Sequence, residues 1–135
     1  MALPRTDATD GLTVADVMHD EFATIPATAT IGEVRAWFAA SASRRLALIA
    51  DHGHYAGSLR PTDVAAPAAV ERFVVEVAHA GQTVAPDADA AIGLGLVLAS
   101  DARRIPVVDT DGMLHGVLAV TTDLQHFACR DRATG

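Results

Sequence analysis

The stretches RRLALIADHGHYAG (residues 44–57) and RRIPVVDTDGMLHG (residues 103–116) follow one pattern. Each begins with two arginines, continues through an apolar run into a turn that contains a glycine, and reaches a second glycine four residues later. An apolar run, a short turn with glycine and a returning segment together predict a β-hairpin. The chain therefore contains two predicted hairpins of the same design.

The similarity between the two stretches extends over most of the chain. A constant offset of 59 residues aligns identical residues on both sides of the hairpins, and after the second glycine the offset becomes 60. The aligned pairs include Thr24/Thr83, Arg44/Arg103, Arg45/Arg104, Gly53/Gly112, Gly57/Gly116 and Asp63/Asp123. Self-similarity at a fixed spacing indicates a repeated structural unit, so we predict two copies of one unit.

The first copy carries clear signals for its elements. Thr28 or Thr30 is the predicted N-cap of a helix, and Glu33 completes a capping box with Thr30. The hairpin follows this helix, and the alanines after Pro61 begin the next helix, because proline is favoured in a first helical turn.

The second copy repeats this order. A strand ends at Thr83 and Val84, a helix covers residues 86–100, and the stretch TTDLQHFA (residues 121–128) starts the last helix. A short leading helix is predicted before each copy, from the capping-box pair Thr13 and Asp16 and from the equivalent stretch VVEVAHAG. Each copy is therefore an α+β unit, and the two copies must pack together to bury both of their sheets.

Composition limits the class of protein. The 135 residues carry a net charge of −7 and all ten basic residues are arginine, so we expect no broad basic face for nucleic acid or anionic membranes. Neither a membrane-spanning apolar run nor the order of a signal peptide is present, which favours a soluble cytoplasmic protein. The single cysteine, Cys129, has no partner for an intrachain disulfide, and we interpret it as a bystander.

The chain resembles a tandem pair of cystathionine-β-synthase (CBS) domains, the arrangement called a Bateman module. The resemblance rests on TVADVM, ATATIGEV, RRLALIADHGHYAGSL and TDV, followed by TVAPDADAAI, RRIPVVDTDGMLHGVL and TTDL. It implies repeats at residues 12–66 and 67–128 between tails at 1–11 and 129–135, with no catalytic or transporter domain attached.

The resemblance also implies an architecture and a function. It implies two βαββα repeats related by pseudo-twofold symmetry, and a disc-shaped homodimer. It further implies that an adenosine-containing ligand, such as AMP, ADP, ATP or another adenosyl compound, binds in clefts between the repeats. A protein partner, which the sequence does not identify, would receive the signal.

The residues that face such a ligand are implied by the same motifs. Asp63 and Asp123, each predicted at a helix start, match the aspartate that binds ribose, and the paired arginines match phosphate-contacting positions. An adenine ring needs apolar walls, whereas phosphates need arginine or helix N-termini. The implied set is Thr24, Ile25, Arg44, Arg45, Arg60, Thr62, Asp63, Thr83, Val84, Arg103, Arg104, Thr121, Thr122 and Asp123.

Structural roles remain open for the same residues. An aspartate at a helix start is commonly an N-cap. Paired arginines can equally hold the C-terminal end of a helix or form surface ion pairs, and Thr24 and Thr83 can satisfy a turn at a strand end.

Two departures from the CBS pattern affect the predicted sites. Arg60 and Val120 stand where the family usually has a serine or threonine, three residues before the aspartate. The second copy also has one extra residue between Gly116 and Asp123, which either forms a β-bulge that moves Thr121 into place or misdirects Asp123.

Other chemistries receive little support from the sequence. His52 and His54 lack a third metal ligand, the stretch DADA lacks the pattern of a calcium loop, and GLGLVL lies inside an apolar helix, where close packing explains its glycines. No activated serine or cysteine nucleophile and no catalytic carboxylate pair is indicated. We therefore expect neither a metal site nor an enzyme.

One predicted helix suggests assembly. Residues 92–99 are apolar on all sides, which a one-sided surface helix is not, so we expect a homodimer in which Trp37 and Phe38 of the equivalent helix take part. Two functions remain open: a regulatory sensor of an adenosine-containing ligand, and a ligand-free homodimeric scaffold with degenerate sites.

Overall fold

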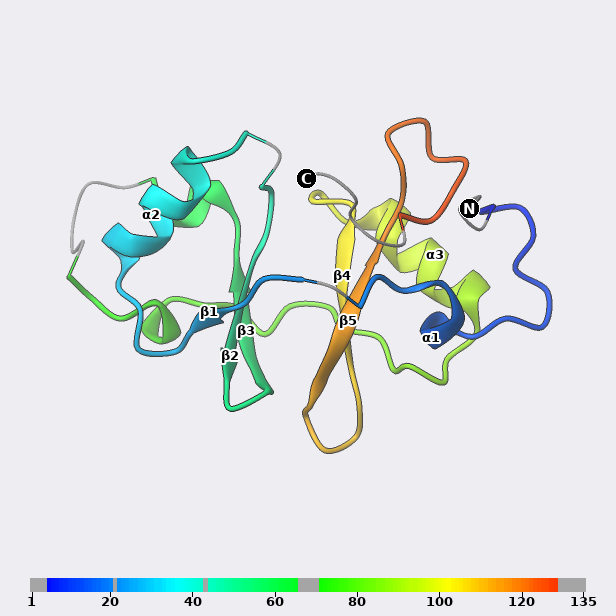
Figure 1. Cartoon of the computed structure of the whole chain (residues 1–135), viewed down its shortest axis with the longest axis horizontal. Coiled ribbons are helices and arrows are strands. Elements are labelled where there is room, and N and C mark those ends of the chain that lie inside the picture. The colour runs from blue at the N-terminus through cyan, green and yellow to red at the C-terminus, as the bar shows by residue number, and fades with distance from the viewer. Residues whose placement is uncertain (1–4, 21, 43, 66–70, 129–135) are drawn as a thin grey trace. The chain divides into compact units, whose positions relative to one another are not determined.

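The computed structural model describes residues 5–20, 22–42, 44–65 and 71–128. The chain forms two compact units, one of Ala23–Gly81 and one of Met1–Phe22 together with Gln82–Gly135. We call them the first-repeat unit and the second-repeat unit, because each contains the hairpin of one sequence repeat (Figure 1). Each unit combines helix with sheet, and the predicted α+β class is confirmed.

The first-repeat unit is a three-stranded sheet with a helix that connects its first two strands. Strand β1 pairs in parallel with β2, and β2 pairs antiparallel with β3, in the order β1-β2-β3. The elements are β1 (Ile25–Pro26), α2 (Ile31–Ala39), β2 (Ala47–Asp51), β3 (His54–Leu59) and the 3₁₀-helices η1 (Pro61–Val64) and η2 (Val74–Glu76).

Helix α2 begins where the capping signals predict. The Thr30 amide donates to Glu33 Oε1 (2.8 Å), and the Glu33 amide donates to Thr30 Oγ1 (3.3 Å). This reciprocal pair satisfies amide groups that the first helical turn leaves without partners. The prediction of a capping box at Thr30 and Glu33 is confirmed.

The second-repeat unit is built around the hairpin of β4 and β5, which pair antiparallel. Val84 pairs in parallel with Val107, in the place that β1 takes in the first-repeat unit. The capping box of Thr13 and Asp16 is also confirmed, with a 2.8 Å hydrogen bond from the Thr13 amide. The elements are α1 (Val14–Val17), α3 (Ala90–Ala99), β4 (Arg104–Val108) and β5 (Leu114–Ala119).

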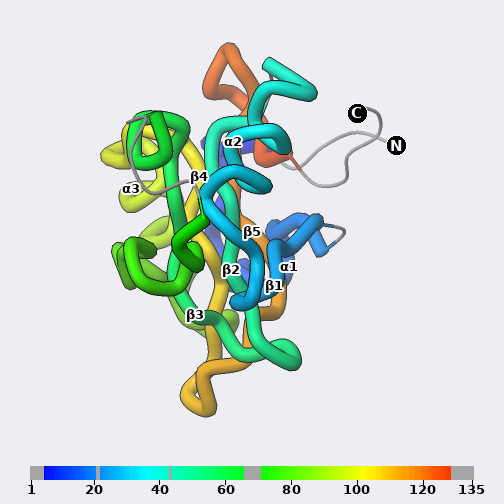
Figure 2. The backbone as a smooth tube through the Cα atoms, turned by 90° about the vertical axis from the view of Figure 1, so that its left-hand side faces the viewer, coloured from blue at the N-terminus to red at the C-terminus, as the bar shows by residue number. Residues whose placement is uncertain are grey.

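Both hairpins form as predicted, with turns of different length. Asp51 pairs with His54, so the first turn consists of His52 and Gly53, both at positive φ (52° and 85°), as a type I′ turn requires. In the second turn the Asp109 amide donates to the Met113 carbonyl (3.0 Å), which makes this turn one residue longer. The β4–β5 hairpin ends in that turn at the lower edge of Figure 2.

Close packing explains one glycine of α3. A Cβ on Gly93 would lie 2.5 Å from Leu118 Cδ2 and 2.9 Å from Val14 Cγ2, whereas a Cβ on Gly95 would meet no atom within 4 Å. The interpretation of the helical glycines as packing residues therefore holds for Gly93 and not for Gly95.

A short leading segment precedes the first strand of each repeat, at residues 13–19 and 73–79. Each leading segment packs on the strands of the other repeat. The Val14 amide donates to the Ala88 carbonyl (2.8 Å), and the Val74 amide donates to the Ala29 carbonyl (2.9 Å), at positions related by the repeat. Val14 and Val74 are both fully buried, so each short segment is held by the core it enters. The compact units are therefore not coextensive with the sequence repeats 12–66 and 67–128.

The prediction of a last helix from TTDLQHFA is wrong. Residues 121–128 form a turn, in which the Thr121 amide donates to the His126 carbonyl (2.8 Å) and Leu124 has a φ of 65° that a right-handed helix does not contain. Burial of Phe127 in the core and its pairing with Val120 fold the chain back instead. In the first repeat only η1 follows the hairpin, and residues 66–70 lie outside the described part.

The extra residue of the second copy is not a bulge in β5. Pairing runs without a shift from Gly116 to Ala119, and the irregularity lies on the other side of Gly116, between Val107 and Val108. The extra residue therefore falls at the end of the strand and in the turn that follows it.

Among the described residues, no helix has the length and apolar character to cross a membrane.

Candidate functional site

Asp63, the predicted ribose-binding residue of the first repeat, lies in η1 directly after β3. Its side chain is 15% exposed, and Oδ2 accepts a 2.7 Å hydrogen bond from the Arg60 amide. Arg60 Nε lies 3.6 Å from Oδ2, and His79 Nε2 lies 3.5 Å from Oδ1. The carboxylate therefore caps η1 and has nitrogen atoms near both of its oxygens.

Asp123, the equivalent residue of the second repeat, does not begin a helix. Its Oδ1 accepts hydrogen bonds from the Thr121 hydroxyl (2.6 Å) and the Gln125 amide (3.0 Å), which stabilise the turn after β5. The hydrogen bond from Thr121, supported by that from Gln125, lowers the pKa of Asp123 below its ordinary value. Asp123 is thus an ionised turn residue, and its predicted position at a helix start is corrected.

The first arginine of each pair contacts the end of the preceding helix. Arg44 Nη1 donates to the Trp37 carbonyl (2.7 Å), and its guanidinium carbon lies 4.5 Å from the centroid of the Trp37 ring system. Arg103 Nη1 donates to the Leu98 carbonyl at the end of α3. A cation at a helix C-terminus satisfies carbonyls that lack partners and complements the helix dipole, so the structural reading of these arginines has direct support.

The second arginines differ from each other. Arg104 Nη1 donates to the Ala102 carbonyl (3.0 Å). Arg45 is exposed, and no side-chain hydrogen bond or ion pair joins it to another residue in the described part of the chain.

The remaining predicted residues lie at strand ends and in turns. Ile25 and Val84 are buried and pair with the middle strands, whereas Thr24, Thr62 and Thr122 are exposed and Thr83 is half-buried. The structure thus joins Asp63 to Arg60 and Asp123 to Thr121. Among the described residues, neither aspartate forms a hydrogen bond or an ion pair with the paired arginines of its own unit.

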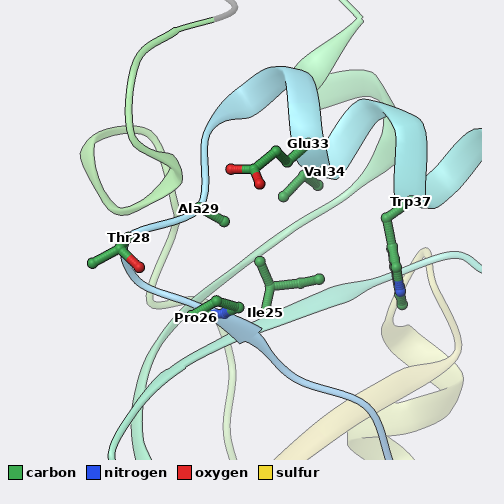
Figure 3. Close-up of a pocket in the computed structure, with 7 residues that line it drawn as sticks. All are labelled: Ile25, Pro26, Thr28, Ala29, Glu33, Val34 and Trp37. Carbon is green, nitrogen blue, oxygen red and sulfur yellow. The ribbon is translucent and has the colours of Figure 1, made fainter.

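A pocket of about 300 Å³ opens beside β1 in the first-repeat unit. The side chains of Glu33 and Trp37 enter it from α2, four residues apart and hence on one helix face, with Ile25 between them in the view of Figure 3. The complete lining is Ile25, Pro26, Thr28, Ala29, Glu33, Val34 and Trp37.

Metal-ligating side chains are not gathered in the described part of the chain, where no group of three or more His, Cys, Asp or Glu residues has the geometry of a metal site. His52 lies beside Asp51, with Nδ1 at 2.8 Å from Oδ1. Cys129 lies outside the described residues.

Comparison with solved structures relates this fold to known proteins. The chain is similar to the CBS pair domain of a protein described as a Mg²⁺ transporter from Shewanella oneidensis, with a TM-score of 0.71 and 14% identity over 84% of this chain and 68% of that one. It is also similar to CBSX2, a CBS-pair protein from Arabidopsis thaliana, solved in complex with AMP, with a TM-score of 0.68 and 20% identity over 81% and 90%. The chain has the fold of a tandem CBS pair.

A third similar structure contains the CBS domains of a transcriptional regulator from Streptococcus pneumoniae, with a TM-score of 0.67 and 19% identity over 80% of this chain and 92% of that one. No family model matches the sequence, and no curated protein matches it. The likeness to CBS pairs therefore rests on the fold and not on sequence similarity.

The sequence did not point to three residues of the candidate sites. His79 lies beside Asp63, and Glu33 and Trp37 line the pocket. His79 follows the repeat, because an offset of 60 aligns it with His19. The capping pattern accounts for Glu33, and the expected dimer contact accounts for Trp37; neither signal indicates a cavity.

Proposed function

We propose that this CBS pair is a non-enzymatic regulatory module that binds an adenosine-containing ligand and passes the bound state to a protein partner. The observation that carries the proposal is the likeness to CBS pairs, one of which was solved in complex with AMP. Binding at such a module needs groups that contact ribose and phosphate, and the first-repeat unit offers both kinds.

Asp63 and Arg45 support this ligand class. A carboxylate has about four acceptor positions, so Asp63 retains capacity for ribose hydroxyls after its bond with the Arg60 amide. Arg45 is exposed and has no side-chain partner within the described residues, and an arginine in that state is suited to a phosphate.

A ligand-free interaction scaffold is the second candidate, and a specific observation favours it. Arg44 and Arg103 already donate to helix-end carbonyls, and Asp123 already accepts from its own turn. These three side chains serve the fold without a ligand, as expected for a CBS pair that keeps its architecture after its sites degenerate.

Titration with AMP, ADP, ATP and S-adenosylmethionine separates the two candidates. A ligand present at a hundred times its dissociation constant is expected to raise the free energy of unfolding by about 2.7 kcal/mol, measured as a thermal shift and followed by calorimetry. Asp63→Asn keeps an oxygen for the Arg60 amide and removes the charge, so it should abolish the shift.

Asp16→Asn is the matched control, because Asp16 is also a capping carboxylate but belongs to α1. This variant should bind ligand as the unchanged protein does. A flat response to all four ligands up to millimolar concentration would contradict ligand sensing and favour the scaffold.

We also propose that the CBS pair forms a homodimer through the exposed face of α3. That face is entirely apolar, and its most exposed large side chain, Ile92, is 58% exposed; its members are Ala91, Ile92, Gly95, Leu98 and Ala99. An apolar face of this kind is a common site of association. In a twofold dimer each residue contributes twice.

Ile92→Lys is therefore expected to raise the dimer dissociation constant at least tenfold, as measured by sedimentation. Val75→Lys replaces another exposed apolar residue, in η2, and should leave association unchanged. A monomeric unchanged protein at high concentration would refute the homodimer.

A further inference from the structure

The pocket beside β1 offers a site with its own chemistry. We propose that it binds a small heteroaromatic amine, with the amino group on Glu33 and the ring beside Trp37. The inference goes beyond the proposed function, because Ile25 alone among the residues implied for the adenosyl ligand lines this pocket.

The inner wall of the pocket is apolar. Ile25, Ala29 and Val34 are buried core residues whose side chains face the pocket (Figure 3). A volume of about 300 Å³ lies at the lower end of the range for small-molecule sites, which suits one or two fused rings rather than a whole nucleotide. The pocket therefore favours a compact ligand with apolar faces.

The strongest polar group at the pocket is an acceptor, the Glu33 carboxylate; it stands beside the Thr28 hydroxyl, which can donate or accept, and the Trp37 indole N–H, which donates. Glu33 is the one charged residue of the lining; its Oε1 is occupied by Thr30, and no described residue bonds to its Oε2. Nearby amides are already used, since Ala29 donates to Pro26 and Val34 donates to Thr30. A ligand that donates a hydrogen bond gains a charged acceptor here, whereas an anion would face the Glu33 carboxylate.

Trp37 provides a rigid aromatic wall. Arg44 stacks on its ring at 4.5 Å and donates to its carbonyl at 2.7 Å, which fixes the end of α2 and the orientation of the ring. Aromatic pairs prefer offset or edge-to-face contacts, and a flat ring beside Trp37 can adopt either. An amine on a flat ring therefore satisfies both Glu33 and Trp37.

Fluorescence of Trp37 tests the proposal directly, because Trp37 is the single tryptophan of the chain. Adenine and purine have the same ring system and differ by one amino group, so they are the two probes. Adenine is expected to change the Trp37 emission with saturation between about 0.1 and 1 mM. Purine should bind about tenfold more weakly, since it lacks the amino group that donates to Glu33 and keeps only the ring N–H that adenine also has.

Glu33→Gln is the decisive variant. Glutamine also completes a capping box, so the start of α2 is kept. With its amide oxygen bonded to Thr30, its amide nitrogen faces the ligand and opposes another donor. Adenine should then bind no better than purine, while Asp16→Asn, the same change in another capping box, should retain the tenfold preference.

Two outcomes would overturn the proposal: no change of Trp37 emission with adenine, or an adenine preference that survives Glu33→Gln. Neither outcome affects the proposed function, which is measured with nucleotides and Asp63→Asn. Conversely, adenine binding that depends on Glu33 and not on Asp63 supports the pocket even when nucleotides fail to bind. Adenosine and AMP, titrated in the same way, show whether the ring is accepted alone or as part of a nucleotide.

Discussion

Replacing Phe127 by alanine is expected to lower the free energy of unfolding by about 3–5 kcal/mol, the usual cost of removing a buried phenylalanine. Phe127 is 0% exposed and is the largest fully buried side chain in the described part of the chain. It packs in the core of the second-repeat unit with Val14, Val97 and Leu118. The loss is a large part of the 5–15 kcal/mol that stabilises a typical domain.

Phe73→Ala is the matched control, because Phe73 is 49% exposed and removing it leaves no closed cavity. Its cost should be about 1 kcal/mol or less. Urea denaturation followed by circular dichroism measures both variants. Equal losses for Phe127→Ala and Phe73→Ala would show that the turn after β5 does not anchor the core.

Gly116→Ala is expected to cost about 3 kcal/mol, at the upper end of the range for overpacking. A Cβ at this position would lie 2.8 Å from the His19 carbonyl oxygen and 2.9 Å from the Met18 sulfur. The oxygen belongs to the leading segment, which pairs with β5 through His19 and Val117. Because backbone cannot rotate away as a side chain can, the added methyl group must separate the segment from the strand.

Gly95→Ala makes the same chemical change with the opposite expected result. Gly95 is exposed in α3 and a Cβ there meets no atom of the chain within 4 Å, so in a dilute, monomeric sample alanine should stabilise the protein by about 0.5–1 kcal/mol through its better helix propensity. Thermal unfolding of the two variants is the measurement. A stable Gly116→Ala protein would contradict close passage of the leading segment over β5.

Each hairpin has a second glycine because a leading segment crosses its last strand at that position. Gly57 is the repeat partner of Gly116, and a Cβ on it would lie 2.9 Å from Ala78 Cβ and 3.1 Å from the His79 carbonyl oxygen. Ala78 and His79 belong to the other leading segment, at the positions equivalent to Met18 and His19. The pattern that revealed the repeat therefore preserves two places where a segment crosses a strand.

The candidate sites were only partly predictable. The repeat and the resemblance brought Asp63 and Asp123 forward, and the structure places each after the last strand of its hairpin. Their hydrogen-bond partners depend on the local path of the chain, which differs between η1 and the turn after β5. The contacts of Arg44 and Arg103 depend on where each helix ends, and no motif in the sequence specifies that a nearby carbonyl will accept from arginine.

The register of strand pairing could not be predicted from the sequence either. The ungapped offset aligns Ile49 with Val108, whereas Ile25 pairs with Ile49 and Val84 pairs with Val107. Strand β4 is therefore shifted by one residue from the position that the offset of 59 gives it, and the turn after β4 is one residue longer than the turn after β2. Similar apolar side chains occupy all of these positions, so only pairing across the sheet distinguishes them.

The sequence by itself determined the features that depend on neighbouring residues. The capping boxes of Thr30 with Glu33 and Thr13 with Asp16 join residues three apart, and the turns at Gly53 and Gly112 need a positive φ that glycine adopts readily. The repeat then implied that such features occur twice. These signals are local, and they survive in the folded protein because packing agrees with them.

Only the tertiary structure decided where the leading segments pack and which path residues 121–128 take after β5. The valines at the start of these segments suit either core, and their burial in the other repeat's unit depends on contacts between residues far apart in sequence. The stretch TTDLQHFA has acceptable helix signals, yet burying Phe127 outweighs the small free energy that a short helix would gain. Long-range burial thus overrode local propensity where the two disagreed.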